Sequence, residues 1–483
     1  MKHIVCIFLL LISFSGVAQF NNEQLHQIDS LNVIVANQSS ADTSLASAYV
    51  ALSEILYVSN IDTLIALSGK AKNIAEKALK NQPSEETKKS LQRSLALALN
   101  NIGYVYYIKG DVPKALEYFI KPLTIQEEIG DKPGIAASLN NIGTIYRDQG
   151  DISKALEYLH KSLKLRVEIL EVSGIASSLN NIGHIYQVQG DVSKAFEYYH
   201  KSLQIREKIE DKVGVAECLN NIGAVYYDQG YVSKALEYFH KSLTIREEKG
   251  YKKGIALSLN NIGAIYKKQG DIPKALEYYN KSLTIFKEIG SKEGIASSLS
   301  HIGNIYKSQG DISKSLEYQY KSLKIREEIG SKKGISISLN NIGVLEIKEG
   351  SLESAEKHLQ RSLKLAREVG LPRRISESSY NLSKLAKKQG NYQFAIEMYE
   401  LHIQMRDSIN SETTQKAIVQ QEAGYVYEKQ KAIDDAEHEK QITIEKLEHE
   451  KRLAIEQEEQ KKQKVITYGI GAGLVLVIGF LIF

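Results

Sequence analysis

The stretch GIASSLNNIGHIYQVQGDVSKAFEYYHKSLQIRE, residues 174–207, decides the fold, because it returns with small changes every forty residues. At its centre two asparagines, Asn180 and Asn181, interrupt what otherwise has the pattern of an amphipathic helix. Asparagine is a poor helix former because its amide competes for backbone hydrogen bonds, at a cost of roughly 0.5 kcal/mol relative to alanine. A pair that recurs despite this cost indicates a role for the amides themselves.

The asparagine pair marks a regular internal repeat. It recurs at 100–101, 140–141, 220–221, 260–261 and 340–341, and Ser300-His301 replaces it once. Internal repetition at this period is typical of stacked structural units that share a continuous core. We therefore expect one elongated array of similar units in the middle of the chain, not several separate domains.

Each unit is predicted to contain two helices. In the unit that starts at Gly134, the apolar residues of the first helix fall on one face, at i, i+4, i+7 and i+11: Ile135, Leu139, Ile142 and Tyr146. Those of the second helix are spaced four apart: Ala155, Leu159 and Leu163. Gly150 is expected to end the first helix and Asp151 to cap the second. The charged run at 321–334 in a later second helix is expected to face solvent.

A glycine adjoins the apolar face of the first helix in each of the seven good repeats, as Gly143 does in the second unit. Glycine inside a helix costs about 1 kcal/mol relative to alanine. Its recurrence predicts that a neighbouring helix approaches closely at this position.

These residues resemble the tetratricopeptide repeat, in which Trp, Leu-Gly, Tyr, Ala, Phe and Pro recur at fixed spacings. The corresponding residues of the second unit are Leu139, Ile142-Gly143, Tyr146, Ala155 and Leu159. The chain contains no tryptophan, and a longer second helix and linker replace the closing proline. The forty-residue spacing with SLNNIG is similar to the kinesin-light-chain subgroup. The resemblance implies an all-α fold, a right-handed superhelical solenoid of helix-turn-helix repeats.

The resemblance covers residues 91–410, as seven good repeats and a degraded eighth. Residues 19–90 are interpreted as an N-terminal helical cap with a degenerate repeat. Residues 411–464 are dense in Glu and Lys and predict a long charged helix. A coiled coil that makes a homodimer through 415–483 and a single exposed helix are both compatible with this pattern.

The two ends of the chain have the pattern of membrane-targeting segments. Residues 1–18 combine Lys2, an apolar run from Ile4 to Phe14 and small residues, which is typical of a signal peptide; an uncleaved anchor is the alternative. Residues 465–483 carry no charge and are long enough for a transmembrane helix. We expect a single-pass protein of the cell membrane with periplasmic, extracytoplasmic repeats. A tail-anchored protein with cytoplasmic repeats is the alternative, because no Lys or Arg follows the span.

The second asparagine of each pair is the candidate binding residue. Asn141 points away from the apolar face, and an amide can both donate to and accept from a peptide unit. In the subgroup resembled, the asparagine before Leu-Gly contacts the backbone of bound peptide, which implies this role for Asn101, Asn141, Asn181, Asn221, Asn261 and Asn341, but not for His301. The alternative is that the amides bond to adjacent repeats as a ladder, which is as well supported for the Asn140 column.

The neighbours on the same helix face change from unit to unit. Those predicted to line the groove are Tyr104, Thr144, His184, Asn304, Asp148, Asp228 and Lys268. A constant amide among changing neighbours favours a groove that holds the main chain of an extended peptide everywhere and selects its side chains locally.

Several other functions find no support in the sequence. The 62 Lys and Arg residues nearly balance the 58 Asp and Glu residues, so nucleic acid is not an expected partner. No nucleophile–base pair or nucleotide-binding loop occurs, so we expect no enzyme, no catalytic residue, no cofactor and no small-molecule substrate. His160, His200 and His240 share one column of second helices, and we expect surface histidines, not a metal site. Cys218 stands in a column of serines and is interpreted as a small packing residue.

Two functional hypotheses remain at this point. The first is a membrane-anchored tetratricopeptide repeat scaffold that binds an extended peptide or protein segment in its concave groove. The second is the sensing and relay portion of a transmembrane signalling protein. Its output domain, a histidine kinase, a nucleotide cyclase or a transcriptional regulator, would then lie outside this chain.

Overall fold

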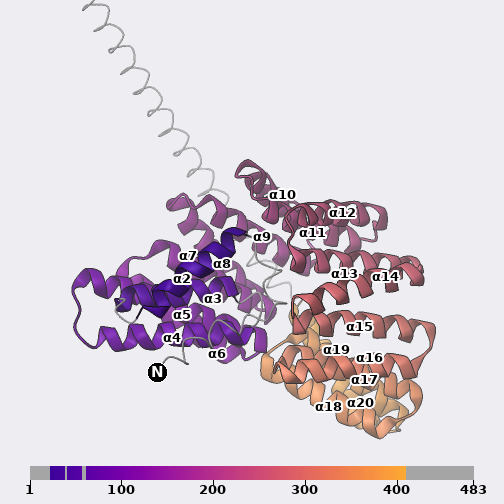
Figure 1. Ribbon diagram of the computed structural model, residues 1–483. Helices are drawn as coiled ribbons and strands as arrows, with labels where there is room; N and C mark the ends of the chain where they lie inside the picture. The colour runs from indigo at the N-terminus through magenta and orange to yellow at the C-terminus, as the bar shows by residue number, and fades with distance from the viewer. Residues whose placement is uncertain (1–21, 38–40, 57–60, 410–483) are drawn as a thin grey trace, which may run out of the picture. The chain divides into compact units, whose positions relative to one another are not determined.

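The structure, a computed structural model, describes residues 22–37, 41–56 and 61–409. Within these ranges the chain forms nineteen α-helices, α2 to α20, and no strand (Figure 1). The predicted signal peptide at 1–18, the charged helix at 411–464 and the transmembrane helix at 465–483 lie outside the described residues. None of the helices within the described ranges is long and apolar enough to cross a membrane.

The all-α repeat architecture is confirmed as eight helical hairpins in series. The first helices of the eight units are α5 (Glu85–Lys109), α7 (Lys132–Asp148), α9 (Val172–Gln189), α11 (Lys212–Asp228), α13 (Lys252–Gln269), α15 (Lys292–Gln309), α17 (Lys332–Glu349) and α19 (Pro372–Lys388). The second helices are α6 (Val112–Ile129), α8 (Ile152–Glu168), α10 (Val192–Lys208), α12 (Val232–Glu248), α14 (Ile272–Glu288), α16 (Ile312–Glu328), α18 (Leu352–Val369) and α20 (Tyr392–Ile409). Each helix packs against the next, and Figure 1 shows pairs such as α13 and α14 lying side by side.

Three further helices precede the first unit: α2 (Asn22–Ala36), α3 (Asp42–Leu56) and α4 (Ile61–Leu79). Helices α3 and α4 pack against each other and both contact α5. The α3–α4 pair thus takes the place that a preceding repeat would have, and it covers the start of the array.

The turns inside the hairpins follow the predicted chemistry. Gly150 has a left-handed backbone with φ of 77°, which a residue with a Cβ rarely adopts. The Asp151 side chain then accepts a 3.1 Å hydrogen bond from the backbone N–H of Lys154. The same cap forms at Asp111, Asp191, Asp271 and Asp311. Short, local signals therefore place the boundary between the two helices of most units.

The apolar face of the second helix is as predicted, whereas that of the first helix is rotated. Ala155, Leu159 and Leu163 are buried. In α7, Ile142 is buried, but Ile135, Leu139 and Tyr146 are only half-buried, and the core there is formed by Ala136, Ile142 and Ile145. Helix α8 contacts α7 on the Ala136 side, where Ser162 Oγ donates to the Ala136 carbonyl at 2.7 Å. The difference is particular to α7, because the equivalent Leu179, Ile182 and Tyr186 of α9 are all buried.

The predicted close approach at the recurring glycine is confirmed at Gly143. A Cβ at this position would lie 2.8 Å from Leu159 Cγ and 3.1 Å from the Ala155 carbonyl oxygen. Both atoms belong to α8. The glycine therefore lets the two helices of the hairpin approach more closely than any side chain would allow.

The prediction that the charged run at 321–334 faces solvent is wrong at Arg326, which is only 4% exposed. Its Nη1 donates to Ser338 Oγ at 2.9 Å and to the Gly334 carbonyl at 3.4 Å in the next unit, and its Nη2 pairs with Glu293 of α15 at 3.2 Å, so both units satisfy the buried charge. Arg246 makes the equivalent bonds to Gly254 and Ser258. Each of these arginines connects its own second helix to the following first helix. It lies three residues after a buried leucine, on the side of the helix that faces this neighbour.

The prediction of surface histidines holds for His200, which is exposed, but is wrong for His160. His160 is buried because α8 buries a wider face than the equivalent helices, including all of Leu156. Burial lowers the pKa of His160 to about 4, so the imidazole is neutral at pH 7. A neutral imidazole can be accommodated in the core as a largely apolar ring.

Candidate functional site

The first asparagine of each pair binds the next repeat. Asn180 and Asn260 are 5% and 7% exposed. Asn260 Nδ2 donates to Ser298 Oγ at 3.2 Å, and Ser298 Oγ lies 3.4 Å from Asn260 Oδ1. Asn100 makes the same pair of contacts with Ser138. This column therefore joins adjacent first helices, as the ladder interpretation predicted for it.

The second asparagine of each pair binds the preceding repeat. Its Nδ2 donates to Oδ1 of the first asparagine one unit earlier, at 2.8–3.0 Å: Asn181 to Asn140, Asn221 to Asn180, Asn261 to Asn220 and Asn381 to Asn340. We call this series the asparagine ladder. Asn381, in the degraded eighth repeat, is a full member, although the sequence analysis did not place it among the site residues.

The ladder adapts where its partners change. Asn101 donates to Ser53 Oγ at 3.2 Å and to Glu54 Oε1 at 3.5 Å, both on α3, so the ladder continues into the N-terminal hairpin. Asn341 donates to Ser300 Oγ and to Gln319 Oε1, each at 3.4 Å. Asn141 occupies the same half-buried position on α7. All six predicted asparagines thus lie on one equivalent face of successive first helices.

The ladder uses only part of each amide. An asparagine side chain offers two N–H donors and a carbonyl oxygen that can accept two bonds. Within the described ranges, no hydrogen bond reaches Oδ1 of Asn181, Asn221 or Asn261, and all three residues are partly exposed. The ladder therefore fixes the orientation of these amides and leaves their carbonyl oxygens available on the surface.

The predicted variable positions lie on the same face. Tyr104, Thr144, His184, Asn304 and Asp148 are half-buried, and Asp228 and Lys268 are exposed. Many of them also contact the neighbouring unit. Asp228 accepts from Gln187 Nε2 at 2.9 Å, and Lys268 Nζ donates to the Tyr227 carbonyl at 3.0 Å.

Asp148 is held by two cations and one hydroxyl group. Its carboxylate accepts from Tyr107 Oη at 2.7 Å and pairs with Arg147 at 2.8 Å and with Lys333 Nζ at 3.3 Å. Burial alone raises the pKa of Asp148, but the charges of Arg147 and Lys333 and the bond from Tyr107 outweigh burial and lower the pKa to about 2. Asp148 is therefore ionised and fixed in position at neutral pH.

His184 and His301 are both neutral at pH 7. Burial, together with the charges of Arg147 and Lys333, lowers the pKa of His184 to about 4. His301, which replaces the ladder asparagine, stacks on Tyr279 with ring centroids 5.1 Å apart. Burial lowers its pKa to about 4 as well. Neither histidine adds a positive charge to this face.

A further column on the same helices was missed by the sequence analysis. It lies three residues beyond the Thr144 column and contains Arg147, Gln187, Tyr227, Lys267 and Lys307. Burial lowers the pKa of Lys267 and of Lys307. The signal that could have found it is the spacing i, i+3, which places these residues one turn further along the same face.

Cys218 is fully buried, and its Sγ lies 3.3 Å from Ser202 Oγ. Burial raises the pKa of the thiol to about 11. The interpretation as a packing residue is confirmed. In the described part of the chain, no group of three His, Cys, Asp or Glu side chains is arranged to hold a metal ion.

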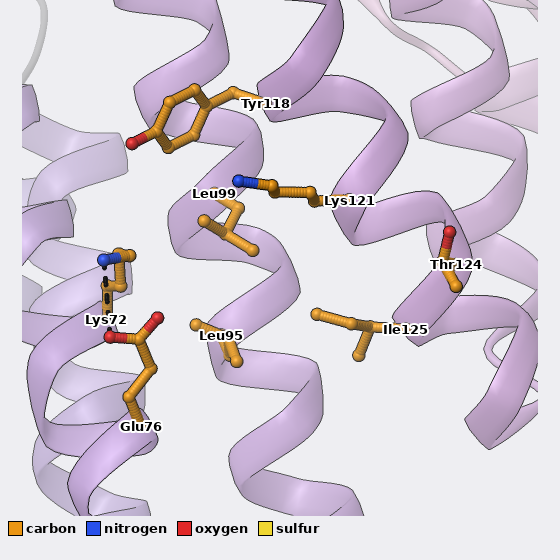
Figure 2. Close-up of a pocket in the computed structure, with 8 residues that line it drawn as sticks. All are labelled: Lys72, Glu76, Leu95, Leu99, Tyr118, Lys121, Thr124 and Ile125. Atoms are coloured by element: carbon orange, nitrogen blue, oxygen red, sulfur yellow. Dashed lines mark ion pairs between the residues drawn. The ribbon is translucent and has the colours of Figure 1, made fainter.

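A cavity of about 480 Å³ lies between α4, α5 and α6 (Figure 2), and no asparagine of the ladder lines it. Leu95 and Leu99 of α5 lie at its centre, with Lys72 and Glu76 on one side, Lys121 and Ile125 on the other, and Tyr118 above them in the view. Its charged groups are already paired, Lys72 with Glu76 at 3.3 Å and Lys121 with Glu117 at 2.6 Å. The cavity therefore offers a ligand little unsatisfied charge.

A family model of the tetratricopeptide repeat matches residues 94–166, 174–248, 254–328 and 334–408, which is more than half of the chain. The chain belongs to the tetratricopeptide repeat family. The four matched segments include both helices of all eight units, so the family covers the whole asparagine ladder from Asn100 to Asn381. Among curated proteins, no sequence matches the chain significantly.

Several solved structures are similar to this tetratricopeptide repeat protein at low sequence identity. A Rap protein complexed with Competence and Sporulation Factor is 13% identical, with a TM-score of 0.52, over 80% of this chain and 99% of that one. A Signal Transduction ATPase with Numerous Domains protein with a tetratricopeptide repeat sensor, from Pyrococcus horikoshii, is 17% identical, with a TM-score of 0.43, over 81% of this chain and 64% of that one. BtubC from P. vanneervenii is 22% identical, with a TM-score of 0.38, over 44% of this chain and 91% of that one.

Proposed function

We propose that this tetratricopeptide repeat protein is an interaction scaffold whose asparagine ladder binds the main chain of an extended peptide or protein segment. The observation that carries the proposal is the repeated, partly exposed carbonyl oxygen of Asn181, Asn221 and Asn261, each oriented by a bond to the unit before it. Because backbone N–H groups recur along any extended chain, a row of fixed acceptors matches a peptide of any sequence.

The ladder hydrogen bonds hold the asparagine amides in a fixed orientation, and this favours peptide binding. An amide that is free to rotate loses conformational entropy when it binds, whereas an amide already held by a neighbour loses little. The variable residues beside the ladder, such as Thr144, Asp228 and Lys268, would then select the side chains of the peptide. The Rap protein that shares this fold was crystallised with Competence and Sporulation Factor, which supports a ligand-binding role for such a repeat array.

The scaffold is proposed to be exported and anchored in the cell membrane. The pattern of residues 1–18 and the uncharged segment at 465–483 support this location, with the repeats on the periplasmic side. A tail-anchored protein with cytoplasmic repeats is the alternative topology. The segment at 415–483 is proposed to make a homodimer, and in the second functional hypothesis the same segment would relay a signal to an output domain.

The test is a selection of peptide ligands with the full-length purified protein. A phage-displayed library of random dodecapeptides is selected on the immobilised protein, and the affinity of the enriched peptides is then measured for the Asn221→Ala/Asn261→Ala double variant. We expect binding to weaken about ten-fold or more, because two main-chain hydrogen bonds in a partly dry site are lost.

The matched control is Asn280→Ala, which removes an exposed asparagine of α14 that bonds only to the Leu276 carbonyl of its own helix. This variant should bind the same peptides as tightly as the unmodified protein. If no peptide is enriched over uncoated beads, or if the double variant binds with unchanged affinity, the proposed function is wrong.

A further inference from the structure

The last helix of the array, α20, exposes an apolar stripe. Tyr392, Ile396 and Tyr399 fall on one helix face at i, i+4 and i+7, and they are 65%, 61% and 48% exposed. In an earlier unit the residue in the column of Ile396 is Phe196, whose ring centroid lies 4.8 Å from that of Tyr226 on the following first helix, α11. The stripe therefore includes the position at which a second helix contacts the first helix of the next unit.

Arg406 of α20 has a different environment from its equivalents in earlier units. It stands in the column of Arg246 and Arg326, which are 6% and 4% exposed. Both of these arginines donate to a serine hydroxyl and to a glycine carbonyl of the following first helix. Arg406 is exposed, and within the described ranges its guanidinium pairs with the adjacent Asp407 at 2.8 Å. Helix α20 thus carries both the apolar and the charged contact residue of a second helix that another helix follows.

The sequence beyond α20 continues the forty-residue pattern. Val419 stands in a column of leucines, and Val426 stands in the column of Tyr226. Ala423, a small residue, takes the place of the recurring glycine. Gln420-Gln421 takes the place of the asparagine pair and keeps two amides at this point. Residues 412–429 therefore have the pattern of a ninth first helix.

Two residues of this segment depart from the pattern. Lys416 stands in the column of Ala176, whose carbonyl accepts from Ser202 Oγ of its own hairpin partner at 2.8 Å. Gln430-Lys431 replaces the Gly-Asp turn of most units, so the sequence predicts no hairpin partner after this helix. A lysine is compatible with that open side. Glu422 stands where the seven good repeats carry a buried isoleucine, and nothing in the structure explains it.

We propose that residues 412–429 form a ninth first helix that docks on α20, with Val426 against Ile396. Arg406 would then donate to the Thr414 carbonyl, because Arg326 donates to the carbonyl eight residues after it. This segment of the same chain is favoured over a second copy because it begins three residues after α20 ends, and closing so short a loop costs little entropy. The inference goes beyond the proposed peptide binding and does not depend on it.

The docked helix would join the repeats directly to the charged segment at 430–464. A repeat array moves as a series of packed neighbours, so a ninth helix packed on α20 passes a displacement of the last unit to the segment that follows. The homodimer contact proposed for 415–483 is then confined to the residues after 429.

The test is chemical crosslinking of paired cysteines in the full-length protein without its native cysteines, Cys6→Ser/Cys218→Ser. The docking pair is Ile396→Cys/Val426→Cys. The matched control is Ile396→Cys/Glu428→Cys, which moves one cysteine two residues along and so to nearly the opposite side of the helix. Both proteins are treated with a short bismaleimide at several protein concentrations, and the linked peptides are identified by mass spectrometry.

We expect a link within one chain that forms at least about ten-fold faster in the docking pair than in the control pair, because docking raises the effective concentration of one cysteine beside the other. Equal rates in the two pairs would show that the segment is not docked. Links between two chains in the docking pair would place a second copy on α20. Either result would overturn the proposal and leave the peptide-binding function intact.

Hydrogen exchange followed by mass spectrometry gives an independent readout. In the unmodified protein, amides of residues 412–429 should exchange about a hundred-fold more slowly than those of 440–460. In the Ile396→Glu variant this protection should be lost, because a carboxylate replaces the apolar contact, while α13 should keep its protection. The same exchange rates for both segments in the unmodified protein would contradict the docked helix.

Discussion

The asparagine pair combines a structural and a binding role in adjacent residues. Asn180 accepts from Asn221 of the next unit at 3.0 Å while Cys218 Sγ lies 3.9 Å from the same oxygen. Two asparagines destabilise the helix through their low helix propensity. This loss is offset because each amide forms a hydrogen bond with a polar atom of a neighbouring helix. Since the bonded asparagines are 41 residues apart, no local pattern in the sequence distinguishes the ladder from a row of peptide-binding amides. The structure shows that the ladder forms and that, within the described ranges, no hydrogen bond reaches Oδ1 of Asn181, Asn221 or Asn261.

Asn221→Ala is expected to destabilise the protein by about 1–2 kcal/mol, because it removes the N–H donor of a buried acceptor on Asn180. Chemical unfolding of the full-length protein in urea, followed by circular dichroism, measures the change in midpoint. Asn280→Ala, at the exposed position on α14, should change the free energy of unfolding by less than about 0.5 kcal/mol. An equal effect of both substitutions would contradict a structural role for the ladder.

Other residues show where sequence reasoning succeeds and where it fails. The caps at Asp151 and Gly150 were predictable because capping depends on residues within four positions. Arg326 was misplaced because its neighbours in the sequence are charged, whereas its partners Ser338 and Glu293 lie on other helices and are distant in the sequence. Residues that bond across units therefore carry no local signal of their burial.

At the scale of secondary-structure elements, the helical hairpin depends on one close contact. The Gly143 Cα faces Leu159 and the Ala155 carbonyl of α8, and a Cβ there would lie closer to both than normal packing permits. The sequence predicted this contact from the recurrence of glycine within a helix. It did not predict which residues of α7 are most buried, because the face of a first helix is shared between its own hairpin partner and the units on both sides.

Gly143→Ala is expected to destabilise the protein by about 1–3 kcal/mol, because steric overlap outweighs the better helix propensity of alanine. The matched control is Gly69→Ala in α4, where no heavy atom lies within 4 Å of the added Cβ. That variant should be more stable by about 0.5–1 kcal/mol. Thermal unfolding of both variants gives the comparison, and a stabilised Gly143→Ala protein would contradict the close approach.

At the scale of the whole array, units far apart in the sequence are also in contact. Lys333 of α17 reaches Asp148 of α7, 185 residues away, at 3.3 Å. Nearby, Val369 and Leu371 join the hydrophobic cluster that contains Val112 and Phe119. The sequence analysis predicted the repeats but not this contact, because the contact depends on how small rotations between successive units accumulate along the array.

The Asp148–Lys333 pair is expected to contribute about 1 kcal/mol of coupling at pH 7, measured as a double-mutant cycle with Asp148→Asn and Lys333→Met. The folded pKa of Asp148, about 2, lies below its ordinary value of 3.8. The ionised carboxylate therefore stabilises the folded state above about pH 4, and this stabilisation is lost as the pH falls toward 2. Urea unfolding at pH 7 and at low pH tests both statements. Zero coupling at pH 7 would show that the second and seventh units do not meet at this pair.

The central claim is that the asparagine ladder holds the main chain of an extended peptide. The most direct measurement is an experimental structure of the full-length protein bound to a peptide enriched in the selection. The account predicts an extended peptide along the first helices, with its backbone N–H groups donating to Oδ1 of Asn181, Asn221 or Asn261. A peptide bound to the second helices, or in the cavity beside Leu95 and Tyr118, would contradict it.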